Sequence, residues 1–228
     1  DFSCHKGQKI AVIGSTGSGK STLVKLMNRF YDVSRGSIEI NGVDIRKYNL
    51  ESLRTQIGYV AQKAHMFKGS IQSNICFGKP EASVEEMVHA ATVAQASDFI
   101  STREHGYEDE IAEDGTNISG GQKQRLSIAR VILKKPSLYI YDDSFSALDF
   151  KTDATLRKAL KPEVKNAIFF VVAQRISTIM DSDMIIVLDE GQIIGMGTHA
   201  QLLKDCSVYQ EIAHSQLTQK ELDDYERN

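Results

Sequence analysis

Short apolar runs alternate along this chain with segments in which apolar residues recur every three or four positions. The run KIAVIG at 9–14 is typical of a buried strand, and KSTLVKLMNRF at 20–30 has the spacing of an amphipathic helix. Alternation of strands with helices predicts an α/β fold with a largely parallel sheet. Further short strands are predicted at 57–62, 138–142, 167–174 and 184–188.

Two stretches carry the signals of antiparallel hairpins. GSIEINGVDI at 36–45 alternates apolar and polar residues around the pair Asn41-Gly42, which favours a tight two-residue turn. DEGQ at 189–192 separates two apolar runs and has the composition of a second turn. We therefore expect an antiparallel β hairpin region beside the parallel sheet.

A mostly helical block interrupts this alternation. Residues 83–101 begin with a capping box from Ser83 to Glu86, and residues 119–136 begin at a serine cap and stop at a proline. We interpret the block as an inserted subdomain, followed after the last strands by a helical tail whose last dozen residues are expected to fray. The predicted division is a core at 1–62 and 137–205, an inserted helical subdomain at 63–136, and a C-terminal helical tail at 206–228.

Composition narrows the classes of function. The 228 residues carry a net charge of −3 with both signs mixed, which argues against a nucleic-acid partner. The three cysteines lie far apart, which favours a reducing intracellular setting over disulfides or zinc. Because the longest apolar runs are far shorter than the ~20 residues that cross a bilayer, and no signal peptide is visible, we expect no direct membrane insertion. The first strand begins almost at residue 1, so we expect the chain to be part of a longer protein.

The segment GSTGSGKS at 14–21 fits the phosphate-loop pattern and lies between a strand and a helix, as that motif requires. Its glycines allow successive backbone N–H groups to turn toward one anion, and the following helix adds its dipole. We expect Lys20 to reach the β- and γ-phosphates and Ser21 to bind Mg²⁺. The alternative, a flexible glycine turn, does not explain this placement. The predicted contacts are Gly14, Ser15, Thr16, Gly17, Ser18, Gly19, Lys20, Ser21 and Thr22.

Two adjacent carboxylates, Asp142 and Asp143, end the apolar run LYIYD. Like charges side by side at the end of a buried strand are costly unless a cation lies nearby. With a phosphate loop upstream, we expect Asp142 to hold Mg²⁺ through its water shell; the alternative is a simple cap of a helix or turn.

These motifs together resemble the nucleotide-binding domain of ABC transporters over nearly the whole chain. ISGGQKQR at 118–125 resembles the family signature, with Ile118 where Leu is usual; YVAQ resembles the Q-loop through Gln62, and SALD the D-loop ending at Asp149. The resemblance implies ATP and Mg²⁺ as cofactors and a P-loop (RecA-like) core sheet flanked by helices, with an inserted α-helical signature subdomain. It adds a metal-site role for Gln62, and nucleotide contacts for Gln62, Ser119, Gly120, Gly121, Gln122 and Asp149.

The resemblance also implies partners. In this family the signature of one domain faces the γ-phosphate bound on a second nucleotide-binding domain, so ATP joins two protomers. GSIQSNICFGKP at 69–80 and EDEIAEDGTN at 108–117 resemble segments of the exporter branch, although Ala112 and Asp114 depart from the usual Gly and Arg. The expected contacts with coupling helices of transmembrane domains in the same chain are Phe67, Glu110 and the loop around Gln62. The expected location is the cytoplasmic face of the cell (plasma) membrane.

Two catalytic positions depart from the family pattern. Asp143 stands where Glu normally polarises the attacking water, and Gln174 stands where the switch His is usual. Asp is one methylene shorter and Gln cannot be protonated as His can. We therefore expect slow hydrolysis at this site and a non-identical partner domain, as in heterodimeric exporters. The alternatives are an ordinary ATPase with tolerated variants, a non-transport ABC ATPase, and a regulatory nucleotide sensor. Phe2 is expected within the first visible strand, which leaves no candidate for stacking on adenine.

Overall fold

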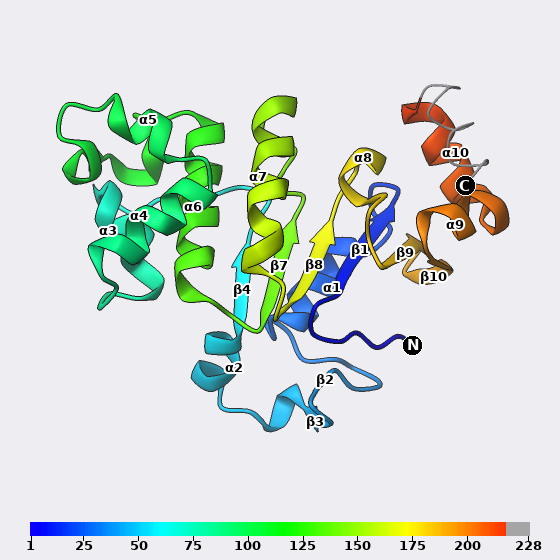
Figure 1. Cartoon of the computed structure of the whole chain (residues 1–228). Coiled ribbons are helices and arrows are strands. Elements are labelled where there is room, and N and C mark those ends of the chain that lie inside the picture. The colour runs from blue at the N-terminus through cyan, green and yellow to red at the C-terminus, as the bar shows by residue number, and fades with distance from the viewer. Residues whose placement is uncertain (218–228) are drawn as a thin grey trace.

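The computed structural model describes residues 1–217. Its centre is a six-stranded sheet in the order β10-β9-β1-β8-β7-β4, shown in Figure 1. All neighbouring strands are parallel except β10, which runs antiparallel to β9. This confirms the predicted α/β fold. The strands are β1 (Lys9–Gly14), β4 (Ile57–Val60), β7 (Leu138–Asp142), β8 (Ile168–Val172), β9 (Met184–Asp189) and β10 (Gln192–Gly197).

Both faces of the sheet are covered. Successive side chains of a strand point to opposite faces, and in β1 this places Ile10 and Val12 in one apolar cluster and Ala11 and Ile13 in another. All four residues are almost fully buried, which explains why the strand is a continuous apolar run. The flanking helices are α1 (Lys20–Met27), α2 (Leu50–Gln56), α7 (Phe150–Glu163), α8 (Ile176–Ile179), α9 (His199–Asp205) and α10 (Ser207–Gln216), with the short 3₁₀ turn η1 (Ile45–Lys47).

The helical block lies to one side of the sheet, in green in Figure 1. The predicted capping box at Ser83 and the predicted serine cap at Ser119 are confirmed, and the cap at Ser119 also forms a capping box, with Gln122. The predicted helix over 83–101 is instead two helices, because Gln95 adopts a positive φ of 59° and breaks the helical path. The elements are β5 (Gly69–Ser70), α3 (Ile71–Ile75), η2 (Cys76–Gly78), α4 (Val84–Val93), α5 (Ser97–Ser101), η3 (Gly106–Glu108), β6 (Glu110–Ile111), η4 (Glu113–Gly115) and α6 (Gly120–Lys134).

Both predicted hairpins are present. The first joins β2 (Glu39–Ile40) to β3 (Val43–Asp44) through Asn41 and Gly42, whose φ angles are 52° and 75°. The second joins β9 to β10 through Glu190 and Gly191, with φ angles of 45° and 78°. A two-residue turn with two positive φ angles matches the twist of the flanking antiparallel strands. Glycine adopts a positive φ readily, which explains why it occupies the second position of both turns.

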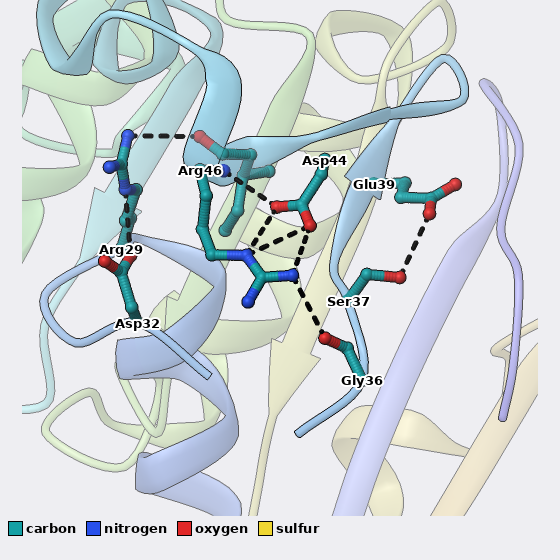
Figure 2. A network of polar contacts seen from close by, with 8 residues as sticks. Arg29, Asp32, Gly36, Ser37, Glu39, Asp44 and Arg46 are labelled. Carbon is teal, nitrogen blue, oxygen red and sulfur yellow. Dashed lines mark hydrogen bonds and ion pairs between the residues drawn. The ribbon is translucent and has the colours of Figure 1, made fainter. Parts of the chain in front are cut away.

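A polar network fixes the first hairpin against the end of α1 (Figure 2). Arg29 donates to the carbonyl oxygens of Ile45 and Tyr48 at 3.1 and 2.9 Å and pairs with Asp32. Next to it, the guanidinium of Arg46 binds the carboxylate of Asp44 and lowers its pKa to about 2. The network explains how a hairpin with strands of two residues keeps its position.

Two expectations about the ends of the chain have different outcomes. Phe2 does not lie in a strand, because β1 begins at Lys9; its ring stacks on Phe170 with the centroids 6.5 Å apart. The predicted fraying concerns a segment that lies almost entirely outside the described residues. Within residues 1–217, none of the helices combines the length and the apolar character that crossing a membrane requires.

Candidate functional site

The phosphate loop turns from β1 into α1 and is pressed against β9. A Cβ atom on Gly14 would lie 2.0 Å from the carbonyl oxygen of Leu188, so no other residue fits there. Gly17 and Gly19 adopt φ angles of 85° and 102°, which side chains other than glycine rarely tolerate. Gly191 at the β9–β10 turn donates to the carbonyl oxygen of Ser18 at 3.0 Å. The loop is therefore held in one shape by backbone contacts on two sides.

Lys20 folds back over this loop. Its ammonium donates to the carbonyl oxygens of Gly14 and Ser15 at 2.8 and 2.7 Å. Burial lowers the pKa of Lys20, and the charges of Asp143 and Asp142 oppose that effect. The loop thus holds a cation at its centre, opposite two carboxylates. Three other predicted phosphate contacts are exposed: Thr16, Ser21 and Thr22. Ser18 is buried.

The two carboxylates lie at the carboxyl end of β7, only 7% and 8% exposed for Asp142 and Asp143. Burial raises the pKa of both carboxyl groups, and the charge of Asp142 adds to the rise at Asp143. Tyr59 donates its hydroxyl to Asp142 at 3.3 Å, a contact that sequence analysis did not predict. Asp143 has a φ of 48°, a left-handed conformation in which Asp is enriched among residues other than glycine.

Two glutamine side chains meet on one oxygen of Asp143. Gln62 donates from its amide to Oδ2 at 3.0 Å, and Gln174 donates to the same oxygen at 2.7 Å. The three residues follow β4, β7 and β8, which are parallel neighbours and so end at the same edge of the sheet (Figure 1). Gln62 and Gln174 are otherwise exposed, so the cluster opens to solvent. Gln62, Asp143 and Gln174 were predicted separately, and the structure joins them.

The signature segment forms the start of α6. The Ser119 hydroxyl accepts from the Gln122 backbone at 3.2 Å, and the Gln122 side chain accepts from the Ser119 backbone at 2.9 Å. A Cβ atom on Gly120 would meet nothing within 4 Å, which leaves the end of this 15-residue helix open. Within residues 1–217 no hydrogen bond or ion pair joins Ser119–Gln122 to the phosphate loop. Gln124 of α6 donates to the carbonyl oxygen of Ala61 at 3.0 Å and so ties the helix to the Q-loop.

Asp149 caps α7. Its carboxylate accepts from the backbone N–H of Thr152 at 3.0 Å. The side chain of Thr152, and then its backbone N–H, lower the pKa of Asp149. Phe150, the next residue, is 75% exposed, and the guanidinium of Arg175 lies 4.9 Å from its ring centroid. The D-loop is therefore close to the segment that carries Gln174.

The donor set fits a magnesium ion that arrives with a nucleotide. Among residues 1–217 no group of three or more His, Cys, Asp or Glu side chains forms a metal site. Mg²⁺ on phosphates needs only one or two protein ligands, with water and phosphate oxygens for the rest. Two adjacent buried carboxylates with raised pKa values, Asp142 and Asp143, supply the negative charge that a cation would neutralise.

The parallel sheet, the phosphate loop and the acids opposite Lys20 define a P-loop nucleotide-binding domain. A family model described as "ABC transporter" matches residues 1–146. The chain belongs to the ABC transporter family, and its resemblance to the nucleotide-binding domains of exporters is confirmed by the relatives that follow.

The putative multidrug export ATP-binding/permease protein YgaD of Bacillus subtilis (strain 168) is 46% identical over 208 residues, which cover 91% of this chain and 36% of that protein. Heavy metal tolerance factor 1 of Caenorhabditis elegans is 42% identical over 219 residues, covering 96% of this chain and 27% of that protein. The structure of a bacterial Atm1-family ABC exporter with ATP bound superposes with a TM-score of 0.89 at 38% identity, covering 92% of this chain and 37% of that chain. The chain spans only about a third of the length of these relatives.

Proposed function

We propose that this chain is the ATP-driven motor domain of an exporter. It binds Mg·ATP, closes around it with a second nucleotide-binding domain, and drives export through transmembrane domains at the cytoplasmic face of the membrane. The names of its relatives, multidrug export protein and ABC exporter, support the transport role. The phosphate loop and Lys20 support nucleotide binding.

The residues of the loop have separable roles in this proposal. Backbone N–H groups of Gly17 and Gly19 and the ammonium of Lys20 bind the phosphates; to do so, Lys20 exchanges its loop carbonyl acceptors for phosphate oxygens. Ser21 and Asp142 would hold Mg²⁺, whose charge would offset the buried carboxylates when bound. The open N-terminus of α6 at Ser119 would receive the γ-phosphate bound on the partner domain.

Hydrolysis at this chain's own site is proposed to be slow. The observation that carries this is the carboxylate of Asp143, which is held by the amides of Gln62 and Gln174. Hydrogen bonds to a carboxylate stabilise its charged form, so the two amides offset part of the rise in pKa that burial gives Asp143, and they occupy its Oδ2 atom. Asp is also shorter than Glu, and a misplacement of about 1 Å can cost about 100-fold in rate. Gln174 offers a neutral donor and no proton.

A direct test compares the wild-type transporter, assembled with its partner, with a variant carrying Asp143→Glu and Gln174→His. The proposal expects the variant to hydrolyse ATP faster by about tenfold or more, since one transition-state donor is worth about 100-fold. Lys20→Ala is the control that gives the rate of ATP hydrolysis when this site does not bind nucleotide. If the wild type hydrolyses as fast as the double variant, the slow-site proposal is wrong.

A regulatory nucleotide sensor is the second candidate. The same Asp143 cluster favours a sensor, because a carboxylate oxygen that already accepts from two amides suits binding without turnover. Reconstitution with the partner domain separates the two: a motor supports ATP-dependent transport, whereas a sensor shows ATP-dependent association alone. The predicted division into a core, an inserted helical subdomain at 63–136 and a C-terminal helical tail at 206–228 stays a prediction.

A further inference from the structure

The last turn of α10 is joined directly to the segment that carries Gln174. The side chain of Gln216 accepts from the backbone N–H of Ile176 at 2.9 Å and donates to the backbone carbonyl of Gln174 at 2.8 Å. One amide group thus binds the main chain on both sides of Arg175. The residues are about forty positions apart in the sequence, so the contact depends on the fold.

This contact matters because it holds the backbone of Gln174 between two buried residues, Ala173 and Ile176, outside any helix or strand. β8 ends at Val172 and α8 begins at Ile176, so Gln174 lies in an irregular connection. Its side chain reaches Asp143, and its backbone is held by Gln216. Gln216, Gln174 and Asp143 therefore form a continuous chain of contacts from α10 to the candidate catalytic acid.

A second anchor holds the far side of the same segment. Arg157 of α7 donates to the carbonyl oxygen of Ser177 at 3.0 Å and pairs with the buried carboxylate of Asp153 at 3.0 Å. The Arg157 contact fixes the start of α8, whereas the backbone carbonyl of Gln174 is held by Gln216. The two anchors together restrict where the Gln174 side chain can point.

The chemistry of the contact requires a primary amide. Glutamine presents one acceptor and a donor group on the same planar head, which matches a backbone C=O and N–H two residues apart. Glutamate keeps the acceptor and loses the donor, and alanine loses both. The helix that carries Gln216 is itself anchored, because Gln210 donates to the carbonyl oxygens of Leu203 and Lys204 in α9.

We propose that Gln216 is a positioning residue, which sets Gln174 beside Asp143 and so makes α10 part of the hydrolysis machinery. The expected effect of Gln216 on kcat rests on the proposed function, whereas its effect on the backbone of Gln174 and Ile176 does not. A displaced α10 would move the Gln174 backbone without touching the nucleotide.

The structural arm of the test is hydrogen exchange on the full-length transporter assembled with its partner. Gln216→Ala removes the acceptor of the Ile176 N–H, so exchange at that amide should be faster by roughly tenfold, the value of one hydrogen bond. Glu211→Ala is the control: it truncates an exposed residue of the same helix and should leave Ile176 unchanged. Equal exchange at Ile176 in Gln216→Ala and wild type would overturn the proposal, whatever the turnover of the site.

The kinetic arm uses the background that carries Asp143→Glu and Gln174→His. There Gln216→Ala should lower kcat by about fivefold with KM for ATP unchanged, and Gln216→Glu should give a kcat between those of Gln216→Ala and the background. The exposed Glu211→Ala should have no effect. Equal losses in the Gln216→Ala and Glu211→Ala variants, or a change in KM alone, contradict a positioning role. If the background itself gains no turnover, the slow-site proposal has failed, and the exchange of Ile176 alone decides the role of Gln216.

Discussion

The side-chain amide of Gln174 donates a 2.7 Å hydrogen bond to the carboxylate of Asp143. These are the two predicted catalytic positions that depart from the expected family pattern, and they contact each other. The departures are therefore one matched pair. A shorter acid accepts from a neutral amide, and each residue suits the geometry of the other.

The matched pair predicts non-additive effects. Asp143→Glu alone pushes a longer carboxylate toward Gln62 and Gln174, and Gln174→His alone faces an acid that is too short, so each single change should gain little turnover. The double variant should exceed the product of the single effects by a coupling energy of about 1 kcal/mol. Steady-state ATPase of the four proteins measures this; strictly additive effects would show that the contact has no role in catalysis.

The buried acids predict an unusual dependence of stability on pH. Because burial raises the pKa of Asp142 above its unfolded value, ionisation costs folding free energy, and the contribution of this group is lost as pH rises through the folded pKa. Without nucleotide, Asp142→Asn should therefore raise the melting temperature at pH 7.

The gain from Asp142→Asn should shrink as the pH falls toward the unfolded pKa of Asp, about 3.9, because the folded wild-type acid is then increasingly protonated and no longer has a buried charge. The exposed Asp205→Asn should change little at either pH. Thermal melts at pH 7 and pH 4.5 check both expectations; a gain that grows on acidification would contradict the sign of the shift.

His199 predicts the opposite dependence of folding stability on pH, with stability falling as the pH falls below neutrality. It is buried with its Nδ1 2.7 Å from the hydroxyl of Tyr209, and burial lowers its pKa. Its contribution to stability is then full above the unfolded pKa of about 6.5 and is lost as pH falls through the folded pKa.

Urea midpoints at pH 7.5 and pH 5.5 should show this loss in the wild type and a weaker one in His199→Gln. The exposed His65→Gln serves as control and should keep the wild-type slope. If the urea midpoint of His199→Gln changed with pH as much as that of the wild type, His199 would not be a source of the pH dependence.

Glycines at two ends of the site predict different outcomes for the same substitution. Gly14→Ala places a Cβ 2.0 Å from a backbone oxygen and should cost about 1–3 kcal/mol of folding free energy, or several degrees in the melting temperature. Gly120→Ala meets nothing within 4 Å and should leave the fold intact. Differential scanning calorimetry of both variants compares them directly, and a stable Gly14→Ala protein would show that the loop is not pressed against β9.

Local sequence signals predicted the local parts of this fold. Asn41-Gly42 gave the first hairpin and Ser119 the start of α6, because turn and cap chemistry depends on residues within four positions. Gln95 did not reveal the break between α4 and α5, because Gln rarely takes a positive φ and has no turn signature.

The contacts of the site were harder to predict. Gln62, Asp143 and Gln174 follow strands that are neighbours in the sheet but distant in the sequence, and strand order is not contained in any one motif. Gln216 carried no signal at all, since its partners are backbone groups that look alike in every sequence. Phe2 was misplaced because an apolar residue near a strand also packs from an irregular segment.

The central claim is that a phosphate loop with Lys20 at its centre holds the triphosphate of ATP. Calorimetric titration of Mg·ATP into the wild type, Lys20→Ala and Lys25→Ala tests it most directly, because Lys25 is an exposed lysine on the same helix with the same charge. The account predicts binding to the wild type and to Lys25→Ala, and at least a tenfold weaker affinity for Lys20→Ala, about 1.4 kcal/mol. Equal affinity of all three proteins would contradict it.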